Sequence, residues 1–274
     1  MIIEEADLSG QTIEGLSQRN SDLRRLNMRG SRIGNSDLAA SVLAGSDLSD
    51  AVLEGVNLAG ANLCRVKFCR TTLIGVNLSN ALLIEADLSD TKVVGATMND
   101  CCAAGSNLAS AQFEGVAMSR ADLSGCQIAN TNFAHAVLKR TTLRNSVLTR
   151  CVFDEVNLEF ADFTRVQIER CSFKGAILVG AVLDDAIATG TSFVGADLFW
   201  AELGRLRCMD CDQRDARYPS PDSPRYAPRH ISMPTIRKEP LYRKCDSELV
   251  RRALSCADSN DPGLDRPSSC NVSG

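Results

Sequence analysis

The sequence has few aromatic residues and only two histidines. Aromatic residues make up 5% of the 274 residues, while Leu, Ala, Ser, Asp and Asn recur throughout, so we expect a core of small and medium side chains used many times. His135 and His230 stand apart, and the chain contains neither a glycine-rich phosphate loop nor a nucleophile elbow. Cys208 and Cys211 form a CxxC motif without a second pair for zinc. These absences predict a protein that is not an enzyme and has no catalytic, cofactor-binding or metal site.

The repeat region also contains no proline. The sequence shows no long apolar run, and its first residues do not have the pattern of a secretory signal. None of the eight prolines precedes Pro219, and no apolar stretch reaches the ~18 residues that span a membrane. Residues 1–10 carry Glu4, Glu5 and Asp7 where a secretory signal needs basic residues followed by an apolar run. We therefore expect a cytoplasmic protein with no membrane span. Its twelve cysteines are then expected to be reduced thiols, several of them at buried positions.

A five-residue period runs through most of the chain. In steps of five from Leu8 to Leu203, without an insertion, 37 of 40 positions are Leu, Ile, Met, Val or Phe. Two residues before each of these, from Ala6 to Ala201, 37 of 40 positions are Ala, Ser, Thr, Val or Cys. This period fits neither a helix nor a straight strand, so the chain must turn once per repeat. The small and large residues then face inward, and the two residues after the large one form a corner.

Similar residues also recur every twenty positions. The residues Gly-Val-Asn-Leu at 55–58 return at 75–78, and a series of phenylalanines has the same spacing: Phe113, Phe133, Phe153, Phe173 and Phe193. Four pentapeptides therefore complete one coil, and the repeats form about ten coils. Each coil would satisfy its backbone groups by bonding to the coils on either side, which agrees with the absence of proline. The prediction is an all-β, four-sided solenoid.

The repeat resembles that of the pentapeptide-repeat family. The family's A(D/N)L unit occurs verbatim at residues 6–8, 61–63, 86–88, 121–123 and 196–198, and the resemblance covers about three quarters of the chain. It implies a right-handed quadrilateral β-helix. One branch, the Qnr-like quinolone-resistance proteins, resembles duplex DNA in size, shape and negative charge and binds DNA gyrase in its place. Other members resemble scaffolds, regulators or secreted effectors, so the fold alone does not define a function.

The sequence predicts four segments. We expect a β-helix over residues 1–210 and a proline-rich linker over 211–245. Residues 246–257 have the apolar spacing of a short amphipathic helix, and residues 258–274 have the composition of a disordered tail.

One side of the predicted rod carries a candidate acidic face. Its members are Asp7, Asp47, Asp50, Asp87 and Asp90. A mimic of DNA needs a continuous negative stripe, because attraction to a DNA-binding surface is mainly electrostatic. Lys67 and Arg70 interrupt the stripe, and residues 1–210 hold 25 acidic against 19 basic residues, a net charge of −6. An ordinary solvated face is the alternative interpretation.

A candidate interface lies on another side, in the last coils. Outward positions there carry large apolar residues that the twenty-residue spacing brings together: Phe160, Ile177, Val179, Phe199 and Trp200. Exposed apolar patches of this kind usually mark an interface. The alternative is that residues after Arg207 cover the patch.

These features together predict a protein-binding solenoid with no direct binding to nucleic acid. By resemblance, DNA gyrase or topoisomerase is the most specific partner, and the C-terminal coils could also form a homodimer. The alternative from another class is a secreted bacterial effector or regulatory scaffold, in which the C-terminal tail carries targeting or partner binding.

Overall fold

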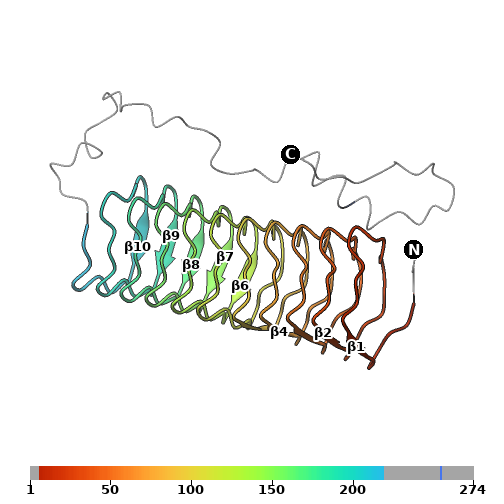
Figure 1. Cartoon of the computed structure of the whole chain (residues 1–274). Coiled ribbons are helices and arrows are strands. Elements are labelled where there is room, and N and C mark those ends of the chain that lie inside the picture. Colours follow the sequence, from red (N-terminus) through yellow and green to blue (C-terminus); the bar gives the residue numbers. More distant parts are fainter. Residues whose placement is uncertain (1–5, 219–253, 255–274) are drawn as a thin grey trace.

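The computed structural model describes residues 6–218 and residue 254, and the coils of residues 6–218 stack into a rod (Figure 1). It is an all-β, four-sided solenoid of parallel strands with about ten coils, as predicted. The strands are short: β1 Thr12–Glu14, β2 Arg32–Gly34, β3 Val52–Glu54, β4 Thr72–Ile74, β5 Lys92–Val94, β6 Gln127–Ala129, β7 Val147–Thr149, β8 Gln167–Glu169, β9 Ile187–Thr189 and β10 Arg207–Met209.

Neighbouring coils pair in parallel with a register of twenty residues. Thr12 pairs with Arg32, and Arg207 pairs with Ile187. Strands β1 to β5 form one five-stranded sheet in chain order, and β6 to β10 form a second one on the neighbouring side of the rod. The remaining sides are held by isolated parallel bridges with the same register, such as Asn57 to Asn77. The coil period inferred from the sequence is therefore confirmed.

The corners depend on one backbone conformation. Every fifth residue from Gly10 to Asp215 has a positive φ, between 46° and 72°. In the corner that begins at Leu48, the N–H of Ala51 donates to the Leu48 carbonyl at 3.1 Å, and Asp50 is the third residue of this turn. Glycine fills 15 of these positions, and the other 27 carry a side chain. Because positive φ disfavours residues with a Cβ, the repeat needs support from its neighbours at each of those corners.

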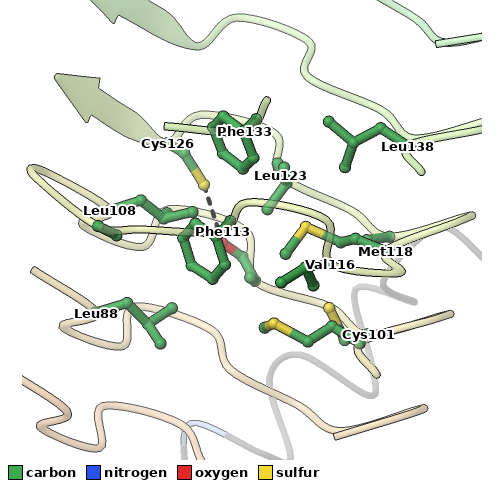
Figure 2. Packing of buried hydrophobic residues seen from close by; sticks show 14 of the residues in the cluster. Leu88, Cys101, Leu108, Phe113, Val116, Met118, Leu123, Cys126, Phe133 and Leu138 are labelled. Atoms are coloured by element: carbon green, nitrogen blue, oxygen red, sulfur yellow. Dashed lines mark hydrogen bonds between the residues drawn. The ribbon is translucent and has the colours of Figure 1, made fainter. Parts of the chain in front are cut away.

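The core consists of inward columns that run along the rod. The small and large residues of most repeats are almost fully buried. In one column, five phenylalanine rings stack with 4.8 to 5.3 Å between neighbouring centroids. Figure 2 shows two of them, Phe113 and Phe133, one above the other. This distance matches the spacing of about 4.8 Å between paired strands, so backbone pairing and ring stacking reinforce each other.

Buried Ser, Thr and Cys side chains connect successive coils. Many of them donate to the carbonyl at the large inward position 23 residues earlier: Thr71 Oγ1 lies 2.7 Å from the Leu48 oxygen, and Cys126 Sγ lies 3.0 Å from the Ala103 oxygen (Figure 2). The same contact is made by Thr91, Ser106, Thr131, Thr141, Ser146 and Cys151. A buried hydroxyl without a partner costs about 1–3 kcal/mol, so these bonds explain why polar residues occupy the small inward position.

The ladder continues past residue 210, where the sequence analysis placed the end of the β-helix. Asp212 pairs with Ser192, and Arg217 pairs with Asp197. Leu254, from the predicted helix, has a helical conformation. The rest of the predicted linker, the rest of that helix and the predicted disordered tail lie outside the described residues. Within residues 6–218 and 254, we find no helix with the length and apolarity that crossing a membrane requires.

Candidate protein-interaction surfaces

Two hollows on the described surface are open to solvent, and the side chains that line them offer little for catalysis or metal binding. One lies over β7, β8 and β9 and is lined by Val147, Gln167 and Ile187, among others. Another lies between Asp185 and Arg207. Across the described coils, no three His, Cys, Asp or Glu side chains gather closely enough to hold a metal ion. The features that can act on a partner therefore lie on the outer surface.

The five predicted acidic residues lie along one side of the rod, in two adjacent columns: Asp7, Asp47, Asp50, Asp87 and Asp90. The first column alternates aspartate with other residues, because Asn27 and Lys67 bridge to the aspartates above and below. The second column lies at the corners, where Arg70 comes between Asp50 and Asp90. The structure thus brings these carboxylates to one side but separates them by neutral or basic residues.

The aspartates of the first column accept hydrogen bonds from the backbone. Asp47 Oδ1 accepts a hydrogen bond from the Ser49 N–H at 2.9 Å, and Asp7 and Asp87 make the same contact two residues on, at 3.0 and 3.1 Å. Asn57 binds the following corner in the same way. This is the local bond by which Asp and Asn favour turns. Hydrogen bonding by the Ser9 side chain, together with this bond from the Ser9 N–H, lowers the pKa of the Asp7 carboxyl below its ordinary value. The preference for Asp before the large residue is therefore structural.

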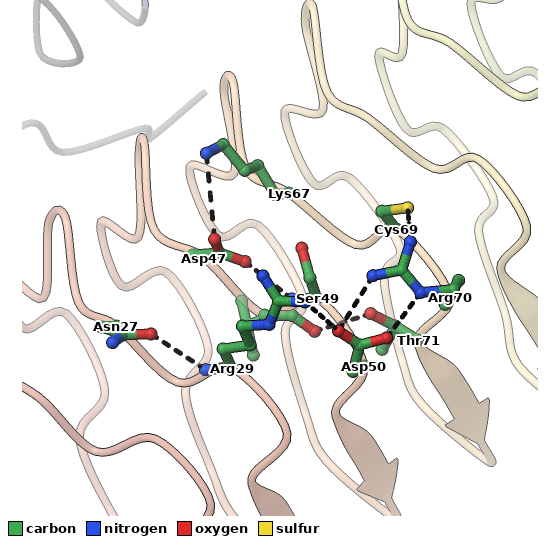
Figure 3. Close-up of polar contacts among 10 residues, drawn as sticks. Asn27, Arg29, Asp47, Ser49, Asp50, Lys67, Cys69, Arg70 and Thr71 are labelled. Atoms are coloured by element: carbon green, nitrogen blue, oxygen red, sulfur yellow. Dashed lines mark hydrogen bonds and ion pairs between the residues drawn. The ribbon is translucent and has the colours of Figure 1, made fainter.

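Basic side chains pair with the remaining acidic charge. Asp50 accepts from Arg70 at 2.6 Å and lies 2.9 Å from Arg29, while Lys67 Nζ lies 3.8 Å from Asp47 (Figure 3). The hydrogen bond from Arg70 lowers the pKa of the Asp50 carboxyl below its ordinary value. Each pair sits in solvent and contributes little stability, but together the pairs offset much of the negative potential on this side.

The predicted apolar interface is assembled in the last coils. Its five residues share one side of the rod: Phe160, Ile177, Val179, Phe199 and Trp200. We call this set the C-terminal patch. Phe160 is 43% exposed, Trp200 is 47% exposed, and the Phe199 and Trp200 rings stack at 4.8 Å. The chain thus leaves three aromatic residues on one outer side, in a protein with few aromatics.

Two of these aromatics occupy corner positions with positive φ. Phe160 has φ 58° and Trp200 has φ 61°, and between them in the same column lies Gly180. A Cβ on Gly180 would lie 2.6 Å from Cε1 of Phe160. The missing side chain of Gly180 therefore makes room for the Phe160 ring to lie across the next coil.

Arginine side chains lie over the rings at both ends of the C-terminal patch. The guanidinium carbon of Arg140 is 5.8 Å from the centre of the Phe160 ring, and that of Arg217 is 4.4 Å from the centre of the Phe199 ring. Both distances suit cation–π attraction. The sequence analysis missed these arginines, although Arg140 is twenty residues before Phe160, and the coil period would have indicated it.

A second outward apolar set, which the sequence analysis did not identify, lies on a different side and nearer the N-terminus. We call it the flank patch: Val42, Ala44, Cys64, Leu82, Ile84, Cys102 and Ala104. These residues follow the twenty-residue spacing on both sides of the inward column through Leu63 and Leu83. The rule that identified the C-terminal patch, applied to every side, would have found this one.

One of the described cysteines differs from the rest in forming a disulfide. The other eight form none, and burial raises the pKa of Cys101 and of Cys126 to about 12, which keeps both protonated and unreactive. Cys102, in contrast, is disulfide-bonded. The expectation that all the cysteines are reduced is therefore wrong at Cys102.

The stacked coils, the regular corners and the surface patches define the chain as a repeat-built β-solenoid that can interact through its outer sides. The Pentapeptide repeats family matches residues 33–68, 65–100, 103–134, 131–166 and 167–204. The chain belongs to the pentapeptide repeat family. No curated protein sequence matches it.

Several solved structures are similar to this chain. HetL, a pentapeptide repeat protein involved in heterocyst differentiation regulation in the cyanobacterium Nostoc, is 24% identical with a TM-score of 0.52, over 80% of this chain and 91% of HetL. QnrB1, a plasmid-mediated fluoroquinolone resistance protein, is 16% identical with a TM-score of 0.36, over 76% of this chain and 87% of QnrB1. A pentapeptide repeat protein from the Arabidopsis thaliana thylakoid lumen is 24% identical with a TM-score of 0.30, over 50% of this chain and 68% of its own. At these identities the similarity shows the fold alone.

The ion pair between Arg70 and Asp50 predicts a measurable shift in titration. In a carbon-detected NMR titration, Asp50 should titrate below the ordinary value of about 3.9, and the change Arg70→Gln should raise its pKa. Because the folded-state pKa is lowered, the pair stabilises the fold above pH ~4, and this contribution is lost as the pH falls through the folded-state value. The change Arg120→Gln, which breaks a similar pair with Asp100, should leave Asp50 unaffected. Equal titration of Asp50 in all three proteins would contradict this interpretation.

Proposed function

We propose that the chain is a non-catalytic protein-binding rod and that the C-terminal patch is its contact surface. The observation that carries this proposal is the exposure of Phe160 and Trp200 at two corners of one column. The fold itself supports a role of this kind, because a solenoid presents long regular sides on which a partner can lie.

Phe160 and Trp200 are energetically unfavourable at the positive-φ positions that they occupy. Bulky residues at positive φ are strained by about 1–2 kcal/mol, and glycine is the residue that avoids this cost. Glycine occupies 15 corners, and at the other described corners Phe160 and Trp200 are the two large apolar residues. Neither ring is buried in the core of the rod, and exposed aromatic side chains of this kind usually mark an interface.

The chemistry of the C-terminal patch suits a protein partner. Trp, Phe and Arg are enriched at the centres of protein interfaces, and the patch combines Trp200 and Phe160 with Arg140 and Arg217 over its rings. Salt bridges flank the apolar centre, with Lys139 2.8 Å from Glu159. An apolar centre with a polar rim is the usual arrangement of a specific interface.

The acidic face supports the gyrase hypothesis less well. Mimicry of DNA requires uncompensated charge, whereas Asp47 and Asp50 are paired with Lys67, Arg29 and Arg70. Asp7 and Asp87 are also engaged, in bonds to the backbone. We therefore favour a contact through the C-terminal patch over electrostatic mimicry. The effector hypothesis depends on the tail, most of which lies outside the described residues.

Replacing the corner aromatics with asparagine should separate binding from folding. Asparagine tolerates positive φ, so Phe160→Asn and Trp200→Asn should keep or raise the melting temperature. Loss of an aromatic hot spot at the centre of an interface costs about 2 kcal/mol or more, so binding should weaken about thirtyfold or more. Sedimentation velocity over a range of concentrations measures self-association, and quantitative affinity capture measures binding to other proteins.

The matched control is Arg165→Asn, which makes the same change at a corner with φ 58° away from the C-terminal patch. It should retain every interaction of the wild-type protein. If both aromatic variants self-associate and capture partners as the control does, the C-terminal patch is not the contact surface.

A supercoiling assay with purified DNA gyrase tests the mimicry hypothesis separately. Because the acidic face is charge-compensated, we expect micromolar protein neither to inhibit supercoiling nor to protect gyrase from a quinolone. Inhibition that weakens with added salt and with Asp47→Asn would overturn this expectation and restore DNA mimicry.

A further inference from the structure

The flank patch is covered although its side chains point outward from the coils. Ile84 is 4% exposed, whereas Val94, at the same corner position two pentapeptides later, is 46% exposed. Cys64, also on the outer side of a corner, is completely buried. Leu254 packs against this cluster, so residues far along the chain supply at least part of the cover.

The flank patch has defined ends. In the same columns, Asp22 and Arg24 lie in the coil before it, and Asp122 and Ser124 lie in the coil after it. All four are polar and outside the apolar cluster. The apolar character is therefore confined to one stretch of the rod and is not a general property of this side.

The length of the flank patch fits the predicted C-terminal helix. From Ala44 to Ala104 the patch rises by three coils, or about 14 Å. A helix over residues 246–257 would be about 18 Å long, and it would carry an apolar stripe that includes Leu254. The segment can therefore cover the flank patch from end to end.

The disulfide of Cys102 points to the same segment. The other eight cysteines of the described coils form no disulfide, so the partner of Cys102 is Cys245, Cys256 or Cys270. Cys256 is two residues from Leu254, and Leu254 packs against the cluster that contains Cys102. Two residues span at most about 7 Å, so Cys256 is the cysteine that Leu254 holds nearest to Cys102.

We propose that the C-terminal segment around Leu254 is the built-in occupant of the flank patch and that a disulfide between Cys102 and Cys256 latches it there. This site is separate from the C-terminal patch and does not depend on the proposed function. Reduction leaves the segment held by apolar contacts alone, so the exposure of the flank patch responds to the redox environment.

The latch forms by thiol–disulfide exchange with a small-molecule disulfide. The Cys102 thiolate attacks one sulfur of that disulfide and displaces a thiolate, which gives a mixed disulfide. The Cys256 thiolate then attacks the Cys102 sulfur and displaces the second small thiolate. The two cysteines lose two protons and two electrons in total, and the small-molecule disulfide is reduced to two thiols.

Peptide mapping of the full-length chain tests the pairing. After oxidation with glutathione disulfide and alkylation, digestion without reductant should yield a Cys102 peptide joined to the Cys256 peptide. Cys256→Ser should leave Cys102 alkylated, while Cys245→Ser and Cys270→Ser should keep the link. Alkylated Cys102 in the oxidised wild-type protein, or a link to Cys245 or Cys270, would overturn the proposed latch.

Labelling of Cys64 in the reduced protein tests whether the C-terminal segment covers the flank patch, independently of the disulfide. With dithiothreitol-treated and desalted protein, Leu254→Asp should speed alkylation of Cys64 about tenfold or more, because it removes the burial of one leucine side chain. Leu254→Met, which keeps an apolar side chain, should leave the rate near that of the wild type. Cys126, inside the rod, should stay protected in all three proteins and reports that the coils are intact. An equal Cys64 rate in wild type and Leu254→Asp would show that the segment does not cover the flank patch.

Discussion

The structure depends on a corner with positive φ at every fifth residue. This conformation turns the chain by one side of a square, so that four repeats return it to the same column one coil further on. Parallel pairing between coils then satisfies the backbone groups, and inward side chains stack on their equivalents. Any change that moves a corner by one residue would exchange inward and outward side chains over the rest of the rod.

The same constraint decides where function can reside. The inward positions are fully used by the core, and the residue before each large side chain is often an Asp or Asn that binds the following corner, as Asp47 does. Outward positions on the corners are the ones left to vary. Many of them carry Gly, Asn or charged residues, whereas Phe160 and Trp200 expose large aromatic side chains at two corners.

Much of this fold could be predicted from the sequence, because the burial of the same two positions in each repeat imposes a strict five-residue period. The large and small inward residues, the twenty-residue coil and the Phe113 to Phe193 column all follow from periodicity. Periodicity also placed Phe160, Val179 and Trp200 on one side. It could not show that Thr71 or Cys126 donates to a carbonyl 23 residues away, because Ala fits the same column and makes no such bond. Periodicity also could not predict that Ile84 is covered or that Cys102 is disulfide-bonded, because both features involve residues outside the repeat.

The central claim is that residues twenty apart lie in one column along a straight rod, and distances along a single column test it most directly. Spin labels on unnatural amino acids at Glu14 and Glu114, five coils apart, and at Glu14 and Lys174, eight coils apart, can be measured by double electron–electron resonance. At a rise of about 4.8 Å per coil, the two separations should be about 24 and 38 Å. Separations that do not increase in proportion to the number of coils would contradict the coil period, and with it the assembly of both surface patches.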